Sequence, residues 1–197
     1  MNFKLIGLTG GIGMGKSTVG ELLQKRGIKM IDTDVVARKL VEPGQPALAQ
    51  IQKSFGASIV DAQGKLKREE LARRVFADSD SRHELEAILH PRIRDAWQAE
   101  AAKWRSSGAA CGVVIIPLLF ETKAGSLFDS IVCVACSMQT QMQRLYERGW
   151  SASQIRQRLE SQWSTEKKMT LSHTVIWTDT TPEITATQLD RIIPPAA

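Results

Sequence analysis

The segment "GGIGMGKS", residues 10–17, is the feature that most restricts how this chain of 197 residues can fold. It follows an apolar run, "FKLIGL" at 3–8, and leads into "STVGELLQKRG" at 17–27, whose apolar residues fall on one face of a helix. The pattern G-x-x-x-x-G-K-[ST] between a strand and a helix is typical of a loop that binds phosphate through backbone N–H groups. The sequence therefore predicts a strand, a phosphate-binding loop and a helix, in that order.

The residue types in this loop suit a nucleotide with a phosphate tail. Glycines at positions 10, 13 and 15 let phosphate oxygens approach the backbone, which larger side chains would prevent. The helix that we expect to begin near Lys16 directs the partial positive charge of its N-terminus to the same place. Lys16 is suited to the β- and γ-phosphates, and the hydroxyl of Ser17 is suited to Mg²⁺. The residues expected to contact the nucleotide are Gly11, Ile12, Gly13, Met14, Gly15, Lys16, Ser17 and Thr18.

Further apolar runs predict the other strands of a parallel sheet. Continuous apolar runs are typical of strands that are buried on both faces. Helical patterns lie between and after them, and a charged, helix-rich stretch runs from about 45 to 105. We therefore predict an α/β protein with a three-layer α/β/α core. The strand candidates are "IKMID" from 28, "CGVVIIPLLF" from 111, "SIVCVAC" from 130 and "HTVIWTD" from 173, and the helix candidates include 35–41, 140–149, 152–163 and 182–192.

The composition fits a folded protein that binds an anionic ligand and needs no disulfides. Lys and Arg outnumber Asp and Glu by 26 to 21, for a net charge of +5, which suits nucleotides and nucleic acids equally. The three cysteines are an odd number and argue against a disulfide framework. The longest apolar run, residues 113–120, is too short to cross a membrane, and we identify no signal peptide. We therefore expect a cytoplasmic protein.

Other motifs narrow the class of nucleotide-binding protein. The guanine-binding motif N-K-x-D of GTPases is absent, and "DAQG" at 61–64, which matches their D-x-x-G motif, lies in a polar turn between helices. The chain is short for a motor ATPase or a helicase. The remaining option is a small kinase. Such an enzyme needs a group that orients the acceptor hydroxyl, an acidic group near Mg²⁺ and a cation near the transferred phosphate.

Asp32 and Asp34 in "IDTD" are the candidates for the group that orients the acceptor. They follow the second strand, where the crevice of an α/β sheet opens, and alternation along a continuing strand would place them on one side. We predict that Asp34 is catalytic or binds the acceptor, although a residue before "VVARKL" is also suited to cap that helix. Arg38 lies one helical turn further on and suits either an acceptor phosphate or a surface ion pair with Asp34.

Basic residues between 144 and 158 predict a lid over ATP. Arg144 and Arg148 are four residues apart on one helical pattern, and Arg156 and Arg158 follow on the next. A solvated basic helix face is the alternative interpretation. We predict that Arg144 is the catalytic cation of the lid.

Glu121 and His90 are further candidates for binding the acceptor. Glu121 ends the segment "PLLFE" and is also a candidate, like Asp32, for holding Mg²⁺ through water, unless it is a simple strand terminus. His90 precedes Pro91, so it either marks a helix boundary or contacts the acceptor.

Three other patterns are interpreted as structural. The segment "CVAC" at 133–136 has the spacing C-x-x-C, but residues i and i+3 of a strand face opposite sides, so we expect buried core cysteines. The histidines at 83, 90 and 173 are scattered and form no set of metal ligands. Trp97 and Trp104 lie among basic helical residues, and we interpret them as core residues of a helical region rather than as a nucleic-acid surface.

Taken together, these motifs resemble those of the dephospho-coenzyme A kinase family. The resemblance covers residues 5–160. "LHPRI" and "PLLFE" accompany a phosphate-binding loop and a D-x-D pair in few other groups, which makes the match specific. The segments that carry it, in the order and spacing of that family, are "LTGGIGMGKST", "IDTDVVAR", "VEPG", "GKLKREELARRVF", "LEAILHPRI" and "PLLFE".

The resemblance implies an enzyme that uses ATP and Mg²⁺ to phosphorylate the ribose 3′-hydroxyl of dephospho-CoA, in the last step of coenzyme A synthesis. It implies that Asp34 contacts the ribose as the candidate base, that His90 belongs to the acceptor region and that Arg144 is the lid arginine. We expect a monomer that binds neither nucleic acid nor a membrane. The implied regions are a P-loop NTPase core at about 1–42, 108–138 and 172–197, an acceptor-binding helical region at about 43–107 and a lid at about 139–166.

The chain departs from the family pattern in two places. After the lid arginine the family reads R-D-G, whereas this chain has "RGW" at 148–150. Near the C-terminus the family has an asparagine close to adenine, whereas "SHTVIWTDTT" offers Ser172, His173 and Thr178. We expect the phosphate chemistry to persist, and adenine affinity and the rate of lid movement to be the properties affected.

Two rival hypotheses remain. One is a kinase for another small metabolite, of the shikimate or nucleoside type, in which a D-x-D pair also serves the acceptor. The other is a nucleotide-sensing or RNA-binding module. Such a module would bind ATP without acceptor-dependent release of ADP, and it would bind RNA with an affinity that falls as salt rises.

Overall fold

The computed structural model describes residues 3–193, and the chain divides into two compact units. The first comprises the chain up to Asp32 and from Ala101 onward, and the second comprises Thr33–Glu100. The divisions fall between strand β2 and helix α2 and inside the long helix α5. They differ from the boundaries at 42 and 107 that the sequence predicts. Each unit has a hydrophobic core of its own.

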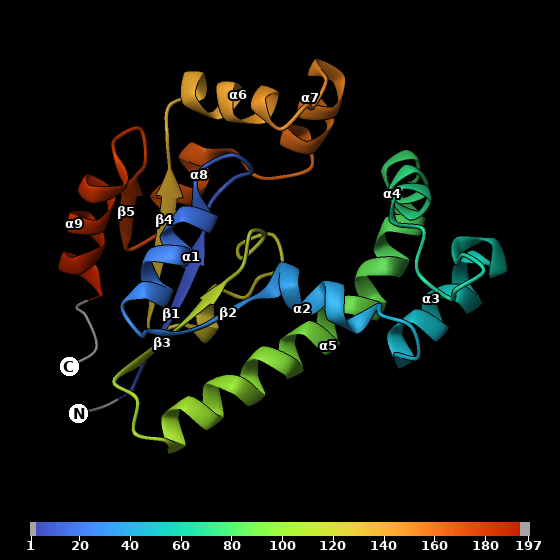
Figure 1. Ribbon diagram of the computed structural model, residues 1–197, viewed down its shortest axis with the longest axis horizontal. Helices are drawn as coiled ribbons and strands as arrows, with labels where there is room; N and C mark the ends of the chain where they lie inside the picture. Colours follow the sequence, from blue (N-terminus) through green and yellow to red (C-terminus); the bar gives the residue numbers. More distant parts are fainter. Residues whose placement is uncertain (1–2, 194–197) are drawn as a thin grey trace. The chain divides into compact units, whose positions relative to one another are not determined.

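A five-stranded parallel sheet forms the centre of the first unit (Figure 1). The strand order is β2-β3-β1-β4-β5, and every neighbouring pair is parallel. β1 lies between β3 and β4, with Ile6 opposite Val113 of β3 and Gly7 opposite Ile131 of β4. The strands are β1 (Lys4–Thr9), β2 (Lys29–Asp32), β3 (Cys111–Ile115), β4 (Ser130–Ala135) and β5 (Thr174–Trp177).

Helices connect the strands of the first unit and make up most of the second. Among the described residues, no helix is long and apolar enough to cross a membrane. The first unit contains α1 (Lys16–Lys25), α6 (Met138–Glu147), α7 (Ala152–Glu160), α8 (Thr165–Thr170) and α9 (Pro182–Ile192). The second contains α2 (Thr33–Leu40), α3 (Pro46–Phe55), α4 (Arg68–Ala77) and most of α5 (Ser79–Ser106). Short 3₁₀ turns lie at Ala57–Ile59 and Gly125–Leu127.

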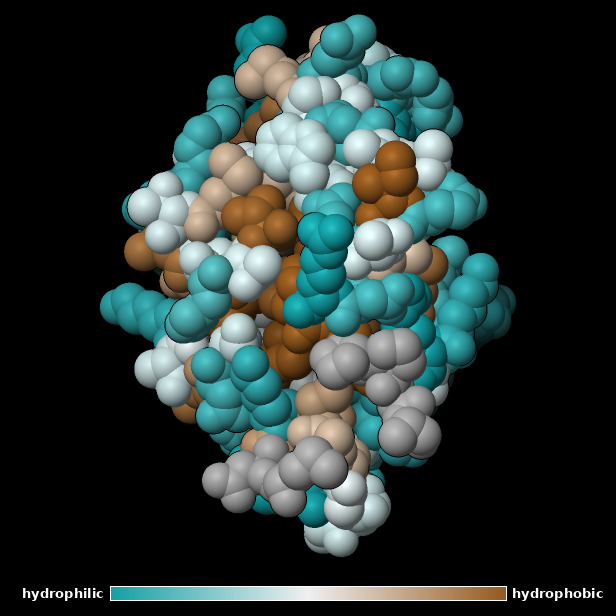
Figure 2. Space-filling model, turned by 90° about the vertical axis from the view of Figure 1, so that its left-hand side faces the viewer, coloured by the Kyte–Doolittle hydropathy of each residue, from teal (hydrophilic) through white to brown (hydrophobic). Residues whose placement is uncertain are grey.

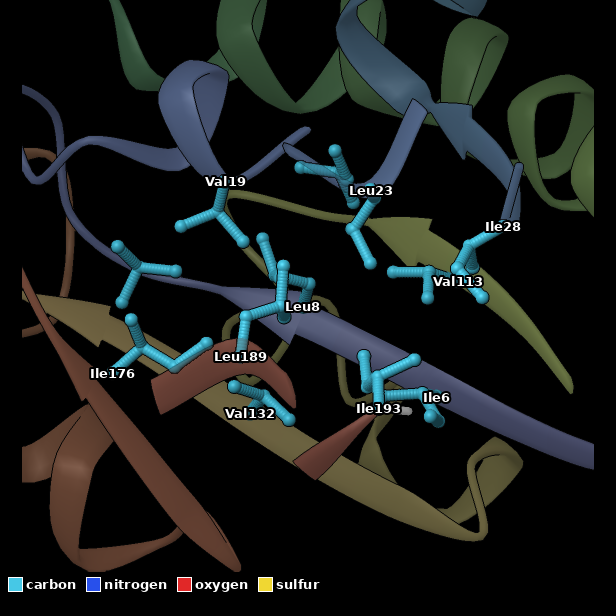
Figure 3. Close-up of a cluster of buried hydrophobic side chains, with 12 residues drawn as sticks. Ile6, Leu8, Val19, Leu23, Ile28, Val113, Val132, Ile176, Leu189 and Ile193 are labelled. Carbon is cyan, nitrogen blue, oxygen red and sulfur yellow. The ribbon is translucent and has the colours of Figure 1, made fainter. Parts of the chain in front are cut away.

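The core of the first unit lies between the sheet and helices α1 and α9 (Figure 3). Ile6 and Leu8 of β1 both belong to it, because alternate residues of a strand share a face. α1 and α9 each turn an apolar stripe toward these strands. The side chains labelled in Figure 3 are Ile6, Leu8, Val19, Leu23, Ile28, Val113, Val132, Ile176, Leu189 and Ile193.

The opposite face of the sheet is covered by α8, the end of α5 and the segment that follows β3. Gly7 of β1 packs closely on Leu119 and Phe128, and Gly112 of β3 packs on the ring of Trp104. A Cβ atom at either glycine would overlap its neighbour. The predicted α/β fold with three layers is therefore confirmed.

The carboxyl ends of the parallel strands meet at one edge of the sheet. β1 leads there into the loop of residues 10–15, which we call the glycine loop, and β2 ends there at Asp32. After β1 the chain passes to β2 and β3 on one side of β1, and then to β4 and β5 on the other side. In open α/β sheets this arrangement opens a crevice for ligands at the carboxyl ends of the strands.

β5 is an edge strand whose outward backbone groups are covered at one point by α9. The Trp177 N–H donates to Gln188 Oε1, and Gln188 Nε2 donates to the Trp177 carbonyl, both at 2.9 Å. Figure 2 views the side on which α9 lies in Figure 1, and it shows apolar atoms set among polar ones. Trp177 and Ile184 are exposed apolar residues of β5 and α9.

The second unit is a group of helices around a separate core. Ile51 of α3, Leu71 of α4 and Ile88 of α5 are buried together there. The segment "DAQGK" forms a turn, as predicted, in which the Asp61 carboxylate accepts hydrogen bonds from two backbone N–H groups of the turn. It is therefore a structural turn within a helical unit.

Pro91 lies inside α5 and does not end it, so the predicted helix boundary at His90 is wrong. A proline inside a helix removes a hydrogen bond and costs about 3 kcal/mol. Ile88 before the proline and Trp97 after it are both buried, so packing holds both halves of the helix in place. Trp97 and Trp104 are core residues, as predicted.

Two other predictions about helices are wrong. α2 begins at Thr33, so Asp34 lies in its first turn rather than at a cap position, and a negative charge is favourable there. The helix predicted over 152–163 ends at Glu160. The Ser164 side chain accepts a backbone N–H and caps a separate short helix, α8.

Candidate nucleotide-binding site

The glycine loop adopts backbone conformations that favour glycine. The φ angle is +148° at Gly10, +77° at Gly13 and +92° at Gly15. Gly15 is the N-cap of α1, and no acidic residue lies in the first turn of that helix. The helix therefore begins without a negative charge of its own, and its partial positive charge faces the loop, where an anion can bind.

Neighbouring segments leave no space for side chains on the inner side of the glycine loop. A Cβ atom at Gly10 would overlap the carbonyl oxygen of Val134 in β4. A Cβ atom at Gly15 would lie 2.9 Å from Thr178 Oγ1, just after β5. Only glycine fits at these two positions with the loop in its present conformation.

Lys16 lies over the glycine loop. Its Nζ donates to the carbonyl oxygen of Gly10 at 2.7 Å and to that of Gly11 at 2.9 Å. The ammonium charge is thus held at the loop by two backbone carbonyls, which is where the sequence predicts a phosphate tail.

Arg144 of α6 joins the glycine loop to the end of β5. Its Nη1 donates to Gly13 O at 3.3 Å and to Thr178 Oγ1 at 3.0 Å, and its Nη2 donates to Thr178 O at 2.6 Å. The Thr178 hydroxyl also lies 2.9 Å from Met14 O. The predicted cation and the predicted loop therefore lie together, whereas Arg148 is the exposed C-cap of α6.

Ile12, in the middle of the glycine loop, is held by two glutamines. Its N–H donates to Gln162 Oε1 at 3.2 Å. Its carbonyl accepts a hydrogen bond from Gln141 Nε2 at 2.7 Å. Gln141 is buried on α6, and Gln162 lies between α7 and α8, so both flanks of the Ile12 residue are fixed by the segment predicted as a lid.

Glu121 is bound to the segment around α8. Its Oε1 lies 2.8 Å from Nζ of Lys168, which is fully buried, and accepts the Trp163 N–H at 2.9 Å. Lys168 Nζ also donates to Pro117 O at 2.7 Å. Among residues 3–193, Glu121 Oε2 is the buried side-chain polar atom that has no hydrogen-bond partner.

Asp179 fastens the start of α6. Its carboxylate accepts hydrogen bonds from the N–H and the hydroxyl of Ser137, the N-cap of that helix. Desolvation raises the pKa of Asp179, but hydrogen bonds from Thr140 and Ser137 together outweigh it, and the net pKa is lowered. The carboxylate is therefore ionised at neutral pH and keeps α6 next to the end of β5.

The cysteines and His173 make structural contacts. Burial raises the pKa of the Cys133 thiol to about 11 and also raises that of Cys136, which disfavours the reactive thiolate. Both are buried, as predicted. His173 Nδ1 accepts the Ile131 N–H at 3.0 Å. In the part of the chain that the structure describes, no three His, Cys, Asp or Glu side chains are grouped so as to hold a metal ion.

Three predicted acceptor residues belong to the second unit. Asp34 and Arg38 are exposed residues of α2, four positions apart and so on the same side of that helix. The Arg38 carbonyl accepts a hydrogen bond from Arg68 Nη2 at 3.3 Å. His90 is half-buried within α5. Their roles toward a substrate stay predictions.

Three residues near the glycine loop were not identified from the sequence. Gln141 lies four residues before the buried Leu145 on α6, so both face the same side of the helix. A polar residue on this apolar side was the signal from which its role could have been predicted. Gln162 lies near the end of the helix predicted over 152–163, where nothing marked it as a residue that contacts the loop. Lys168 lies in α8, where no helix was predicted, so nothing distinguished it from its exposed neighbour Lys167.

Comparison with known proteins finds relatives over almost the whole chain. The sequence model of a family described as dephospho-CoA kinase matches residues 4–183. The chain is 39% identical over 191 residues to the dephospho-CoA kinase of Anaeromyxobacter dehalogenans, covering 96% of this chain and 90% of the relative. It is 35% identical over 190 residues to that of Bdellovibrio bacteriovorus, covering 96% and 94%.

Solved structures show the same fold. A Thermus thermophilus protein of known crystal structure superposes with a TM-score of 0.85 at 28% identity over all of both chains. Dephospho-CoA kinase from Campylobacter jejuni gives 0.71 at 23% identity, over 97% of this chain and 96% of that one. Shikimate kinase from Acinetobacter baumannii gives 0.52 at 16% identity, over 97% and 93%. The predicted fold of the P-loop NTPase type is confirmed.

A substitution at Gly15 tests the shape of the glycine loop. Gly15→Ala places a Cβ 2.9 Å from Thr178 Oγ1 at a φ of +92°, a strain of about 1–3 kcal/mol. We expect ATP affinity, measured by calorimetric titration, to fall about tenfold or more. Gly27→Ala is the matched control, because Gly27 also has a positive φ but nothing within 4 Å of a Cβ. Equal loss of affinity in both variants would contradict the proposed role of the loop.

Proposed function

Because the chain belongs to the dephospho-CoA kinase family, and so phosphorylates dephospho-CoA in coenzyme A biosynthesis, we propose that residues 11–18 hold ATP with its γ-phosphate directed at the ribose 3′-hydroxyl. The observation that carries this proposal is the meeting of Lys16, Arg144 and the glycine loop. Two cations beside a bare backbone and a helix N-terminus form a site for a polyphosphate. The products are coenzyme A and ADP.

The phosphate end of the proposed site offers two positioned cations. Lys16 Nζ donates to two backbone carbonyls of the loop, and phosphate oxygens are strong, charged acceptors for the same ammonium group. Arg144 is fixed beside the loop by Thr178, so its guanidinium is in place before ATP arrives. In this proposal both cations stabilise the negative charge that spreads over the transferred phosphoryl group.

The acceptor end of the proposed site uses the second unit. Asp34 follows Asp32, the last residue of β2, by two positions in the chain, and α/β sheets bind ligands at the carboxyl ends of their strands. In our proposal Asp34 accepts the proton of the 3′-hydroxyl as its oxygen attacks the γ-phosphorus, and ADP leaves. Arg38 and His90, together with Glu121, bind the rest of dephospho-CoA.

Mg²⁺ fits the residues present at the glycine loop. Ser17 provides a hydroxyl in the first turn of α1, and Asp32 and Glu121 provide carboxylates suited to water-mediated binding. The buried Glu121 Oε2 has no hydrogen-bond partner, so it is ready to accept a bond from such a water or from the acceptor. The ion would neutralise charge on the β- and γ-phosphates.

We also propose that the protein acts as a monomer, since one chain carries all these groups. The location that we propose for it is the cytoplasm.

The acceptor is tested by measuring ADP release with a panel of acceptors. We expect ADP release to depend on dephospho-CoA and to stay at background with shikimate and nucleosides, because the recognition groups proposed here suit an acceptor that carries its own phosphate. A Lys16→Ala variant gives the blank for contaminating kinases. ATP binding without acceptor-dependent ADP release would support a nucleotide-sensing module and contradict the proposal.

Asp34→Asn tests the proposed base. We expect kcat to fall about 10²-fold or more, which is the usual scale of general-base catalysis, while the Kd for ATP is kept. Glu84→Gln, which changes an exposed carboxylate in the same unit, is the matched control. A kcat of the Asp34 variant close to that of the control would remove Asp34 from this role.

Arg144→Ala tests the proposed cation. We expect kcat to fall about 10²- to 10³-fold, as when other donors to a developing charge are removed, and ATP affinity to fall much less. Arg144→Lys keeps the charge without the planar fork and should recover part of the rate. Arg191→Ala, on the exposed side of α9, controls for net charge. If only the Kd for ATP changed, Arg144 would be a binding residue alone.

A further inference from the structure

The Ile12 peptide groups are positioned by side chains from outside the loop, on both flanks. Gln162 Oε1 accepts the Ile12 N–H at 3.2 Å, and Gln141 Nε2 donates to the Ile12 carbonyl at 2.7 Å. Between Gly11 and Gly13 the chain has little intrinsic stiffness, because glycine gives the backbone more freedom than any other residue. These two bonds therefore hold the part of the glycine loop that most needs support.

Gln162 is itself anchored through the next residue. The Trp163 N–H donates to Glu121 Oε1 at 2.9 Å, and the same oxygen lies 2.8 Å from Lys168 Nζ. Lys168 Nζ also donates at 2.7 Å to Pro117 O, which accepts the Thr9 hydroxyl at 3.2 Å. Thr9 is the last residue of β1, so these bonds connect the start of the glycine loop, through α8, back to its middle.

The anchor is firm because Lys168 is fully buried. An ammonium group removed from water needs a charged or polar partner at close range, and losing either partner leaves an unpaired buried charge. Glu121 and Pro117 are those partners. The position of Lys168 is therefore fixed relative to the sheet, and so is the backbone at Trp163 that carries Gln162.

We propose that Gln162 is a positioning residue for the nucleotide: its side-chain oxygen orders the glycine loop before ATP enters, and the Lys168–Glu121 pair sets its place. Ordering a site in advance lowers the cost of binding. The inference rests on the proposed function of the loop. Gln162 holds the loop rather than the substrate, so its loss weakens ATP and ADP binding alike and leaves turnover at saturating ATP unchanged.

The size of the effect follows from one neutral hydrogen bond. Such a bond contributes modestly to stability, and its loss lowers the population of the ordered loop by a corresponding factor. We expect Gln162→Met, which keeps the length of the side chain and removes the acceptor, to raise the Kd of ATP and of ADP about 3- to 10-fold. The KM for ATP rises in step, and kcat stays within about twofold.

The test combines the Kd, KM and kcat values with the chemical shift of the Ile12 amide proton, which reports on the hydrogen bond directly. The Ile12 amide proton, followed by nuclear magnetic resonance, should move upfield in Gln162→Met and stay downfield in Gln162→Glu, which keeps an acceptor. Gln157→Met, on the exposed side of α7, is the matched control and should change neither quantity. An unmoved Ile12 amide, unchanged Kd values, or a fall in kcat with Kd values kept would each overturn the proposal.

The anchoring step is tested with Lys168→Met alone and combined with Gln162→Met. If Lys168 acts through Gln162, its effect on the Kd of ADP disappears once Gln162 has been replaced. Additive effects would overturn this step. If Lys168→Met does not fold, the Gln162 variants still decide the main proposal. A wild-type protein that binds ADP but shows no dephospho-CoA-dependent ADP release would contradict the proposed function and leave this inference standing.

Discussion

A loop that binds phosphate through its backbone must be free of side chains where the ligand arrives, so apart from inward-facing side chains such as the buried Met14 its shape depends on contacts from outside the loop. Gly10 and Gly15 show the consequence, because their positive φ angles give access and also remove stiffness. The support comes from other segments. Val134 of β4 closes one side of the loop, and Thr178 and Arg144 close another. The remaining features of the site depend on this external support.

The same arrangement places two positively charged side chains beside the loop. Lys16 and Arg144 are both bonded to backbone carbonyls of the loop, which carry only partial negative charge. These hydrogen bonds hold both cations in position beside the loop. A phosphate tail that enters meets donors that are already oriented, and the exchange gains charge-assisted bonds. Lys168 is fully buried and bonded to Glu121 and Pro117, so we interpret it as a structural cation.

The sequence predicted the parts whose signals are local. The strand, glycine loop and helix around Lys16 follow from a short motif, and α9 follows from its periodicity between 182 and 192. The sequence did not predict the features that depend on tertiary packing. Pro91 stays inside α5 because buried residues on both sides hold the helix, and the burial of Lys168 depends on Glu121, far away in sequence. Hydrogen bonds between the loop and such distant residues do not alter the local sequence pattern, so the pattern does not predict them.

β5 is an edge strand of the sheet, and an edge strand is a place where a second molecule can attach. An exposed strand offers a row of unused donors and acceptors, and another chain can extend the sheet by matching them. Gln188 mimics a short piece of such a chain, because its amide takes both the N–H and the carbonyl of Trp177. Gln188 of α9 thus occupies backbone groups that another strand would need, and it hinders aggregation by strand addition at this edge of the sheet.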